Sequence, residues 1–163
     1  MAFWCCARFE LHREQIAKHF LALAGFTTYI PQIREQRTRR GRRFDTIVPL
    51  FPSYGFIQIV EQWHAARWSI GVLSLIMDGV RPAQVPDKII DDIRKREVNG
   101  IVQLQKQRGL QAGDPVRVAG GPFTGHLALF EEMKPHQRVE ILIAFLGARQ
   151  RVTLQRSDIA QVT

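Results

Sequence analysis

The length of 163 residues, a 45% hydrophobic content and a 23% charged content exclude a disordered or fibrous protein, and fit one medium domain or two small ones. The formal net charge is +8, and residues 1–96 hold 15 Lys and Arg against 9 Asp and Glu, which favours a polyanionic partner such as nucleic acid. No apolar run approaches the roughly 20 residues that cross a bilayer, and Arg8 and Glu10 interrupt the apolar N-terminus before a secretory signal could form, so we expect a cytoplasmic protein with no membrane partner.

The first 96 residues alternate between strand and helix signals. In residues 13–24, Ile16, Phe20 and Leu23 recur at helical spacing, and Gly25 follows where a helix C-cap is expected. Two more helices are predicted, a short one over 62–69 and an amphipathic one over 87–96. Strands are predicted at 3–7, 26–30, within 46–60 and at 71–77. This order predicts an α/β domain over 1–96, with an antiparallel sheet flanked by helices.

The two cysteines, Cys5 and Cys6, lie in the first predicted strand. Adjacent cysteines bridge only with strain, and neither lies near a second Cys/His pair that could hold zinc. We therefore expect them to pack in the strand, and we expect no metal and no cofactor.

Six arginines crowd the segment between the second and third predicted strands, with Glu35 as the one acid among them: Arg34, Arg37, Arg39, Arg40, Arg42 and Arg43. Their mutual repulsion disfavours burial, and the run from Arg39 to Arg43 suits the tip of a β-hairpin that reaches phosphate oxygens. A solvated charged loop is the alternative.

Beyond residue 96 the pattern changes. Residues 97–111 lose periodicity and carry glycines among several glutamines, which is typical of a flexible linker. Short β-rich runs follow at 115–119, 126–131, 138–146 and 149–154, separated by turn sequences. They predict a small all-β barrel over 112–163.

Three large aromatic residues, Phe51, Tyr54 and Phe56, lie close together beside two prolines. This stretch is too irregular to lie entirely within a core, so it predicts an exposed protein-docking surface. The alternative is that the three rings are simply core residues.

Two segments resemble the NusG/RfaH family of transcription elongation factors. The sequence PLFPSYGFI at 49–57 is similar to a strand motif of the family's N-terminal NGN domain, with Ser53 in place of the usual glycine and Gly55 in place of an apolar residue. The sequence VRVAGGPFTG at 116–125 is similar to its KOW motif, and residues 127–130 are closer to RfaH than to housekeeping NusG. The resemblance implies an NGN domain (1–96), a linker (97–111) and a KOW barrel (112–163) in a specialised RfaH-like member.

The same resemblance implies a role at RNA polymerase. In the family, the aromatic strand contributes to a concavity that binds the clamp helices of the largest subunit, and the region after Trp63 faces the gate loop across the DNA cleft. A factor that touches both sides can hold the clamp closed and suppress pausing. Trp63 itself is expected to anchor the core, and Leu75 and Ile76 are expected to border the concavity. The implied polymerase-binding residues are Phe51, Tyr54, Phe56, Leu75, Ile76, His64 and Arg67.

DNA of the transcription bubble is the second implied partner. Helical spacing would place His12 and His19 two turns apart on one side, where RfaH-like proteins read the exposed non-template strand. Surface histidines without a role are the alternative. The expected nucleic-acid-binding residues are Arg8, His12, Arg13, His19, Arg39, Arg40, Arg42 and Arg43.

The predicted barrel supplies a third set of expected binding residues, which would contact a partner protein. KOW domains of the family recruit ribosomal protein S10 or the termination factor Rho, usually through an aromatic residue where this chain has His126. Phe123 either plugs the barrel end or faces a partner, and Phe130 completes the expected partner-binding set. RfaH can refold this domain into a helical hairpin, but the strand-like residues 139–145 predict the barrel, and masking of the NGN domain stays open. A monomer is expected.

The sequence also bears on other function classes. The chain lacks a phosphate-binding Gly-rich loop, a metal-binding His/Cys spacing and a nucleophile elbow, so an enzyme is not expected. A KOW-type RNA- or ribosome-binding protein and a NusG-like factor that assists Rho in termination are the alternatives to an antitermination factor.

Overall fold

A computed structural model describes residues 2–104 and 134–150 of the chain. Its centre is an antiparallel sheet with strand order β2-β5-β1-β6, in which β9 also pairs with β1. The strands are β1 (Phe3–Phe9), β2 (Thr27–Tyr29), β5 (Tyr54–Ile59), β6 (Val72–Leu75) and β9 (Gln84–Val85). The central strand β1 is apolar on both faces because both faces are covered.

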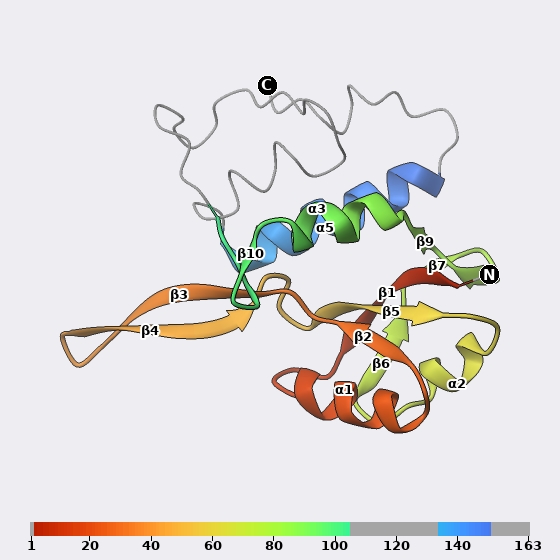
Figure 1. Cartoon of the computed structure of the whole chain (residues 1–163), viewed down its shortest axis with the longest axis horizontal. Helices are drawn as coiled ribbons and strands as arrows, with labels where there is room; N and C mark the ends of the chain where they lie inside the picture. Colours follow the sequence, from red (N-terminus) through yellow and green to blue (C-terminus); the bar gives the residue numbers. More distant parts are fainter. Residues whose placement is uncertain (1, 105–133, 151–163) are drawn as a thin grey trace.

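Helices cover the sheet from two sides (Figure 1). On one side lie α1 (Glu14–Leu23) and α2 (Trp63–Arg67), and on the other α3 (Asp87–Arg94) and α5 (Pro135–Gln150). Because side chains alternate along a strand, Cys5 packs with the α1 side and Cys6 with the α3 side. The predicted α/β domain, with an antiparallel sheet flanked by helices, is confirmed.

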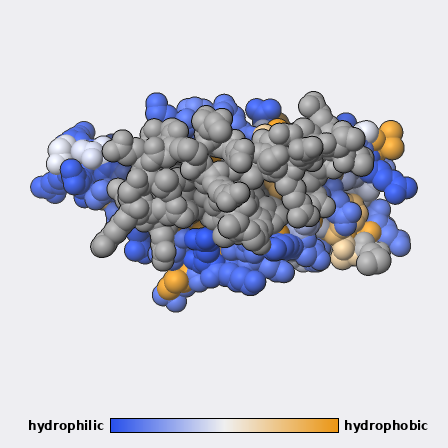
Figure 2. All heavy atoms as spheres, turned by 90° about the horizontal axis from the view of Figure 1, so that it is seen from above, coloured by the Kyte–Doolittle hydropathy of each residue, from blue (hydrophilic) through white to orange (hydrophobic). Residues whose placement is uncertain are grey.

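A long hairpin projects from the sheet (Figure 1). Its strands β3 (Gln32–Arg39) and β4 (Arg42–Pro49) pair in a continuous antiparallel register. The turn residues Arg40 and Gly41 have φ of 53° and 77°, the left-handed pair that a two-residue hairpin loop requires. The predicted hairpin tip is confirmed. Its outer part is exposed, as the repulsion among the arginines predicted, and it forms the mostly hydrophilic left end of the molecule in Figure 2.

The expected linker begins with regular structure, not with a flexible tether. Strands β10 (Glu97–Val98) and β11 (Ile101–Val102) form a tight hairpin whose turn is Asn99-Gly100, with φ of 53° and 79°. Asn-Gly is a strong hairpin signal, and it accounts for regular structure where a flexible linker was predicted. A second short hairpin joins β7 (Met77–Asp78) to β8 (Arg81–Pro82). Residues 105–111 lie outside the described ranges.

The prediction of a strand over 138–146 is wrong in this structure, because these residues belong to α5. The segment has apolar residues at helical as well as strand spacing, and its buried members are Arg138, Leu142, Phe145 and Leu146. Packing against the N-terminal domain selects the helix. The KOW barrel stays a prediction, since 134–150 is the one part of 112–163 that the structure describes, and Phe123, His126 and Phe130 lie outside it. None of the helices in the described part is long and apolar enough to cross a membrane.

Candidate functional site

The aromatic cluster, defined as Phe51, Tyr54 and Phe56, lies on the α3 side of the sheet. The rings of Phe51 and Phe56 are fully buried and meet edge to face, with centroids 6.2 Å apart and planes at 89°. Tyr54 is half-buried and packs against the same core. The expectation of an exposed surface is therefore wrong for Phe51 and Phe56, and the alternative that they are core residues is confirmed for these two rings.

Two helices cover the aromatic cluster. From α3 come three isoleucines, and from α5 come Leu142, Phe145 and Leu146, all in one apolar core with the two phenylalanines. The helices α3 and α5 lie together above the sheet in Figure 1. Part of the cover thus comes from a segment far along the chain, since Arg138 of α5 lies 88 residues after Leu50.

A buried arginine joins α5 to the cluster. The Nε of Arg138 donates a hydrogen bond to the backbone carbonyl oxygen of Leu50 over 2.8 Å. Burial lowers the pKa of the Arg138 guanidinium, and the charge of Glu35 acts in the opposite direction. Sequence reasoning missed Arg138 and its neighbours. The spacing of 138, 142, 145 and 146 repeats at i, i+4, i+7 and i+8, and this signal could have identified a helix face.

The two motif positions that differ from the family pattern, 53 and 55, are both constrained by their surroundings. Ser53 has φ of 66°, a conformation that favours glycine, and its backbone carbonyl accepts a hydrogen bond from the Phe9 amide at 2.6 Å. At Gly55 an added Cβ would lie 2.7 Å from a ring carbon of Phe9 and 2.9 Å from a side-chain carbon of Ile30. The Phe9 ring therefore occupies the space that a larger residue at 55 would need.

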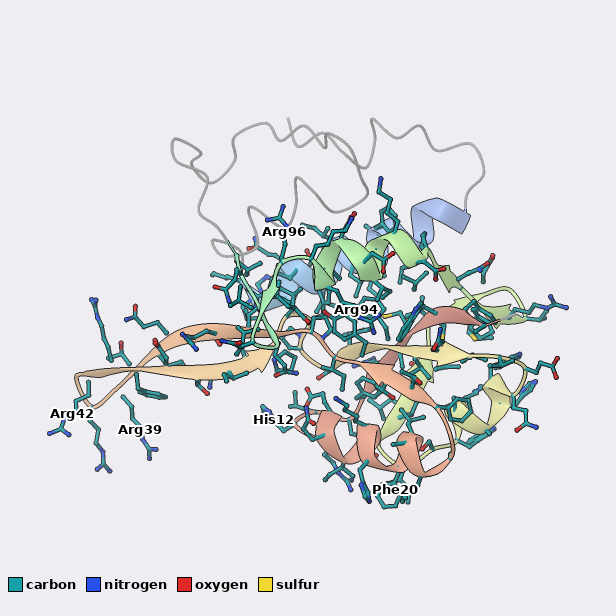
Figure 3. All side chains as sticks on the ribbon, viewed as in Figure 1. His12, Phe20, Arg39, Arg42, Arg94 and Arg96 are labelled. Carbon is teal, nitrogen blue, oxygen red and sulfur yellow. The ribbon has the colours of Figure 1, made fainter. Side chains whose placement is uncertain are left out.

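Tyr29 borders the aromatic cluster and connects it to the short β10–β11 hairpin. Its ring stacks on Phe56 at 6.4 Å, and its hydroxyl donates a short hydrogen bond to the Glu97 carboxylate. Burial, and then Glu97, raise the pKa of Tyr29. The Arg94 guanidinium lies 4.8 Å from the Tyr29 ring centroid and 5.3 Å from that of Trp4 (Figure 3). These contacts fix the end of α3 over the sheet.

The two residues predicted to border the cluster separate. Ile76 packs on its edge, but Leu75 is buried on the opposite face of the sheet, with α1 and α2. The expectation that Leu75 borders the aromatic surface is wrong, because neighbouring residues of an extended chain face opposite sides.

The expected gate-loop residues lie on α2, across the sheet from the aromatic cluster (Figure 1). Trp63 is half-buried against the core, as expected, and the His64 ring stacks on it at 3.6 Å. Arg67 is exposed, with its guanidinium 5.3 Å from the ring centroid of the exposed Trp68. His64 and Arg67 are both exposed on this side of the sheet.

The basic residues near α1 are exposed, but they do not share one helix face. His12 precedes α1 and has φ of 60°, so the expected two-turn helical spacing to His19 does not occur (Figure 3). Arg13 forms an ion pair with Glu10 at 2.5 Å. Arg8 lies on β1, and His19 packs edge to face with Phe20 at 5.4 Å. The set is a dispersed basic surface.

The hairpin tip gathers the strongest positive charge. Arg39, Arg40, Arg42 and Arg43 are all exposed, and Figure 3 shows Arg39 and Arg42 projecting from the same side of the tip. Over the described ranges, the ion pair within the hairpin is Arg37 with Glu35 at 3.3 Å. No group of three or more His, Cys, Asp or Glu in those ranges could hold a metal ion.

The fold and these surfaces define a small α/β domain that carries a basic hairpin and a helix-covered aromatic cluster. A family model described as "Transcription termination factor nusG" matches residues 3–94, which is more than half of the chain. The chain therefore belongs to the NusG family, whose members are non-enzymatic transcription factors.

Relatives extend this likeness beyond the N-terminal domain. The chain is 26% identical over 151 residues to the transcription termination/antitermination protein NusG of Thermus thermophilus, covering 83% of this chain and 80% of that protein. It is also 26% identical over 155 residues to the NusG protein of Vibrio cholerae, covering 92% and 85%. A solved structure described as "Domain interaction in Thermotoga maritima NusG" is similar with a TM-score of 0.49 at 20% identity, over 77% of this chain and 76% of that one.

Proposed function

We propose that this protein is a transcription elongation and antitermination factor that binds the clamp helices of the largest RNA polymerase subunit through the aromatic cluster and suppresses pausing. The supporting observation is the seat of α5, since an apolar helix face already lies on this cluster through Leu142, Phe145 and Leu146. A surface that packs one helix has the shape and the apolar chemistry to accept another.

Binding of the polymerase and packing of α5 exclude one another in this proposal. Phe51 and Phe56 have no exposed surface while α5 is in place, so α5 must leave before a partner helix can reach them. The β-branched residues Val139, Ile141 and Ile143 give α5 a low intrinsic helix propensity. Its helix therefore depends on packing against the domain, and the released segment can take up strands of the predicted KOW barrel.

Other surfaces of the protein supply the proposed contacts with DNA, with the gate loop and with a partner of the KOW domain. The hairpin arginines and the basic set of Arg8, His12, Arg13 and His19 contact DNA of the transcription bubble. His64 and Arg67, across the sheet from the clamp-binding surface, contact the gate loop. The KOW domain recruits a partner such as ribosomal protein S10 or Rho, through Phe123, His126 and Phe130.

The test measures binding of purified RNA polymerase to the immobilised full chain. Leu142→Asp places a charge in the buried seat of α5 and is expected to raise polymerase binding at least roughly tenfold, because an unpaired charge in a core costs several kcal/mol. Glu140→Ala changes an exposed residue of the same helix and should leave binding unchanged. Tyr54→Ala added to Leu142→Asp should reduce the binding again.

Two outcomes would contradict the proposal. Polymerase binding that is equal in the wild type and in Leu142→Asp would mean that α5 does not control access to the cluster. When ribosomal RNA is added as a competitor to the same assay, its retention in place of polymerase would favour an RNA- or ribosome-binding protein. Transcription through a Rho-dependent terminator then separates the two transcriptional roles, since antitermination predicts more read-through and assistance to Rho predicts earlier stopping.

A further inference from the structure

The strand register sorts the hairpin side chains onto two faces. Arg39 lies opposite Arg42, and Arg37 lies opposite Phe44, one step along the same face. The other face carries Thr38 opposite Arg43, and Gln36 opposite Asp45. We call the face formed by Arg37, Arg39, Arg42 and Phe44 the stacking face.

The aromatic ring of Phe44 is exposed to solvent. It is 43% exposed, it lies on a projecting two-stranded hairpin, and it belongs to neither apolar core of the described domain. An exposed phenylalanine loses the hydrophobic stabilisation that burial would give, so its position on the hairpin contributes little to the fold.

The arginines on the same face of the hairpin as Phe44 leave positive charge unbalanced. Arg39 and Arg42 are directly opposed across the two strands, an arrangement that is destabilising for like charges. Within the described ranges neither forms an ion pair, while Arg37 pairs with Glu35 at 3.3 Å on an exposed surface. An anion between Arg39 and Arg42 would relieve their repulsion.

An aromatic face beside paired arginines matches the two chemistries of a single-stranded nucleic acid. A base stacked on Phe44 would have its phosphates near the arginines of the same face, because the Cβ atoms of opposed and diagonal residues on one face are about 5 to 8 Å apart. In a duplex the base faces are already stacked on one another, so an exposed ring gains little there. We propose that the stacking face binds single-stranded nucleic acid, with a nucleobase on Phe44 and its phosphates on Arg39 and Arg42. This inference rests on the proposed nucleic-acid role of the hairpin, and it needs no polymerase.

The experiment measures binding of fluorescently labelled oligonucleotides of about 12 nucleotides to the full chain by anisotropy. Phe44→Ala is expected to weaken binding of a single strand roughly 5- to 100-fold, the loss that corresponds to one base–aromatic stack. Phe44→Trp should restore the affinity. Ile47→Ala removes an exposed apolar residue from the opposite face and should change it less than about twofold.

Binding of matched oligonucleotides separates the contribution of base stacking from the contribution of phosphate charge. A strand whose central nucleotides lack bases should bind the wild type as weakly as the complete strand binds Phe44→Ala, and a duplex should not distinguish the two proteins. Single strands of DNA and RNA with one sequence are compared, and the tighter one identifies the source of the ligand.

Equal affinity of wild type and Phe44→Ala for the complete strand would overturn the inference, as would an equal loss on the abasic strand or on the duplex. Circular dichroism of each variant checks that the domain is folded. Because the assay contains no polymerase, its failure would leave the proposed clamp-helix contact intact, and failure of that contact would leave this result unaffected.

Discussion

The Nε of Arg138 lies 2.8 Å from the backbone carbonyl oxygen of Leu50, so a buried hydrogen bond joins α5 to the residue that precedes Phe51. The bond fixes one turn of α5, while Leu142, Phe145 and Leu146 supply its apolar contact. Specific docking of α5 therefore combines a polar contact with an apolar face.

Replacement of Arg138 by methionine tests this contact. Arg138→Met keeps an apolar stem but removes the donor, and we expect it to weaken docking of α5 by about 1.5 to 3 kcal/mol, because a buried charge-assisted hydrogen bond is lost. Hydrogen exchange of α5 amides measures the change, with Glu140→Ala as the control. Unaltered protection of α5 in Arg138→Met would show that the bond does not hold the helix.

Gly55→Ala should destabilise the domain. The new Cβ would lie 2.7 Å from the Phe9 ring in a fully buried site, so the strand or the ring must move. Overpacking of this kind costs about 1 to 3 kcal/mol. Urea unfolding measures it, and Gln58→Ala, at a half-buried position of the same strand, is the control. A variant as stable as the wild type would mean that Phe9 has room to shift.

Replacement of Ser53 by glycine should stabilise the domain. With φ of 66°, a serine pays a steric penalty that glycine avoids, so Ser53→Gly should raise the free energy of unfolding by up to about 1 kcal/mol. Ser53→Val should lower it, because a β-branched residue is poorly tolerated at positive φ. The urea midpoint should decrease from the glycine variant to the wild type to the valine variant. A valine variant that is more stable than the wild type would contradict this prediction.

Tyr29→Phe should loosen the β10–β11 hairpin. The change removes the hydrogen bond to Glu97 but keeps the ring that stacks on Phe56, and the expected local loss is about 1.5 kcal/mol. Faster exchange of the Gln103 amide, which donates to the Arg96 carbonyl at 2.8 Å, would report it. Tyr54→Phe leaves that bond in place and should not accelerate this amide.

The buried thiol of Cys5 should make stability fall at alkaline pH. Burial raises the pKa of Cys5 from its ordinary 9.0 to about 12, against the smaller effect of a backbone hydrogen bond from Ile57. The folded state holds this proton more tightly, so the contribution is fully present below pH 9 and declines as the pH rises from 9 towards 12. The stability difference between wild type and Cys5→Ala should therefore shrink above pH 9, by up to about 1.4 kcal/mol per pH unit. A constant difference between about pH 8 and about pH 10.5 would exclude this effect.

Local patterns in the sequence determined several elements. The periodicity of α1 and α3 and the apolar run of β1 depend on neighbours a few residues apart, and these elements form as predicted to within a few residues. The arginine repulsion that places Arg39 to Arg43 at a hairpin tip is also local, since burial of so many like charges is excluded in any fold. The motif around Phe51 likewise identified the family.

The tertiary structure decided the state of the aromatic cluster. The apolar run around Leu142 satisfies both a strand and a helix pattern, so its secondary structure depends on which surface it meets. Here it meets Phe51 and Phe56, which are buried because α5 and α3 lie on them. Exposure of those rings is a property of contacts between segments far apart in the chain, and local sequence does not encode such contacts in a form that periodicity can reveal.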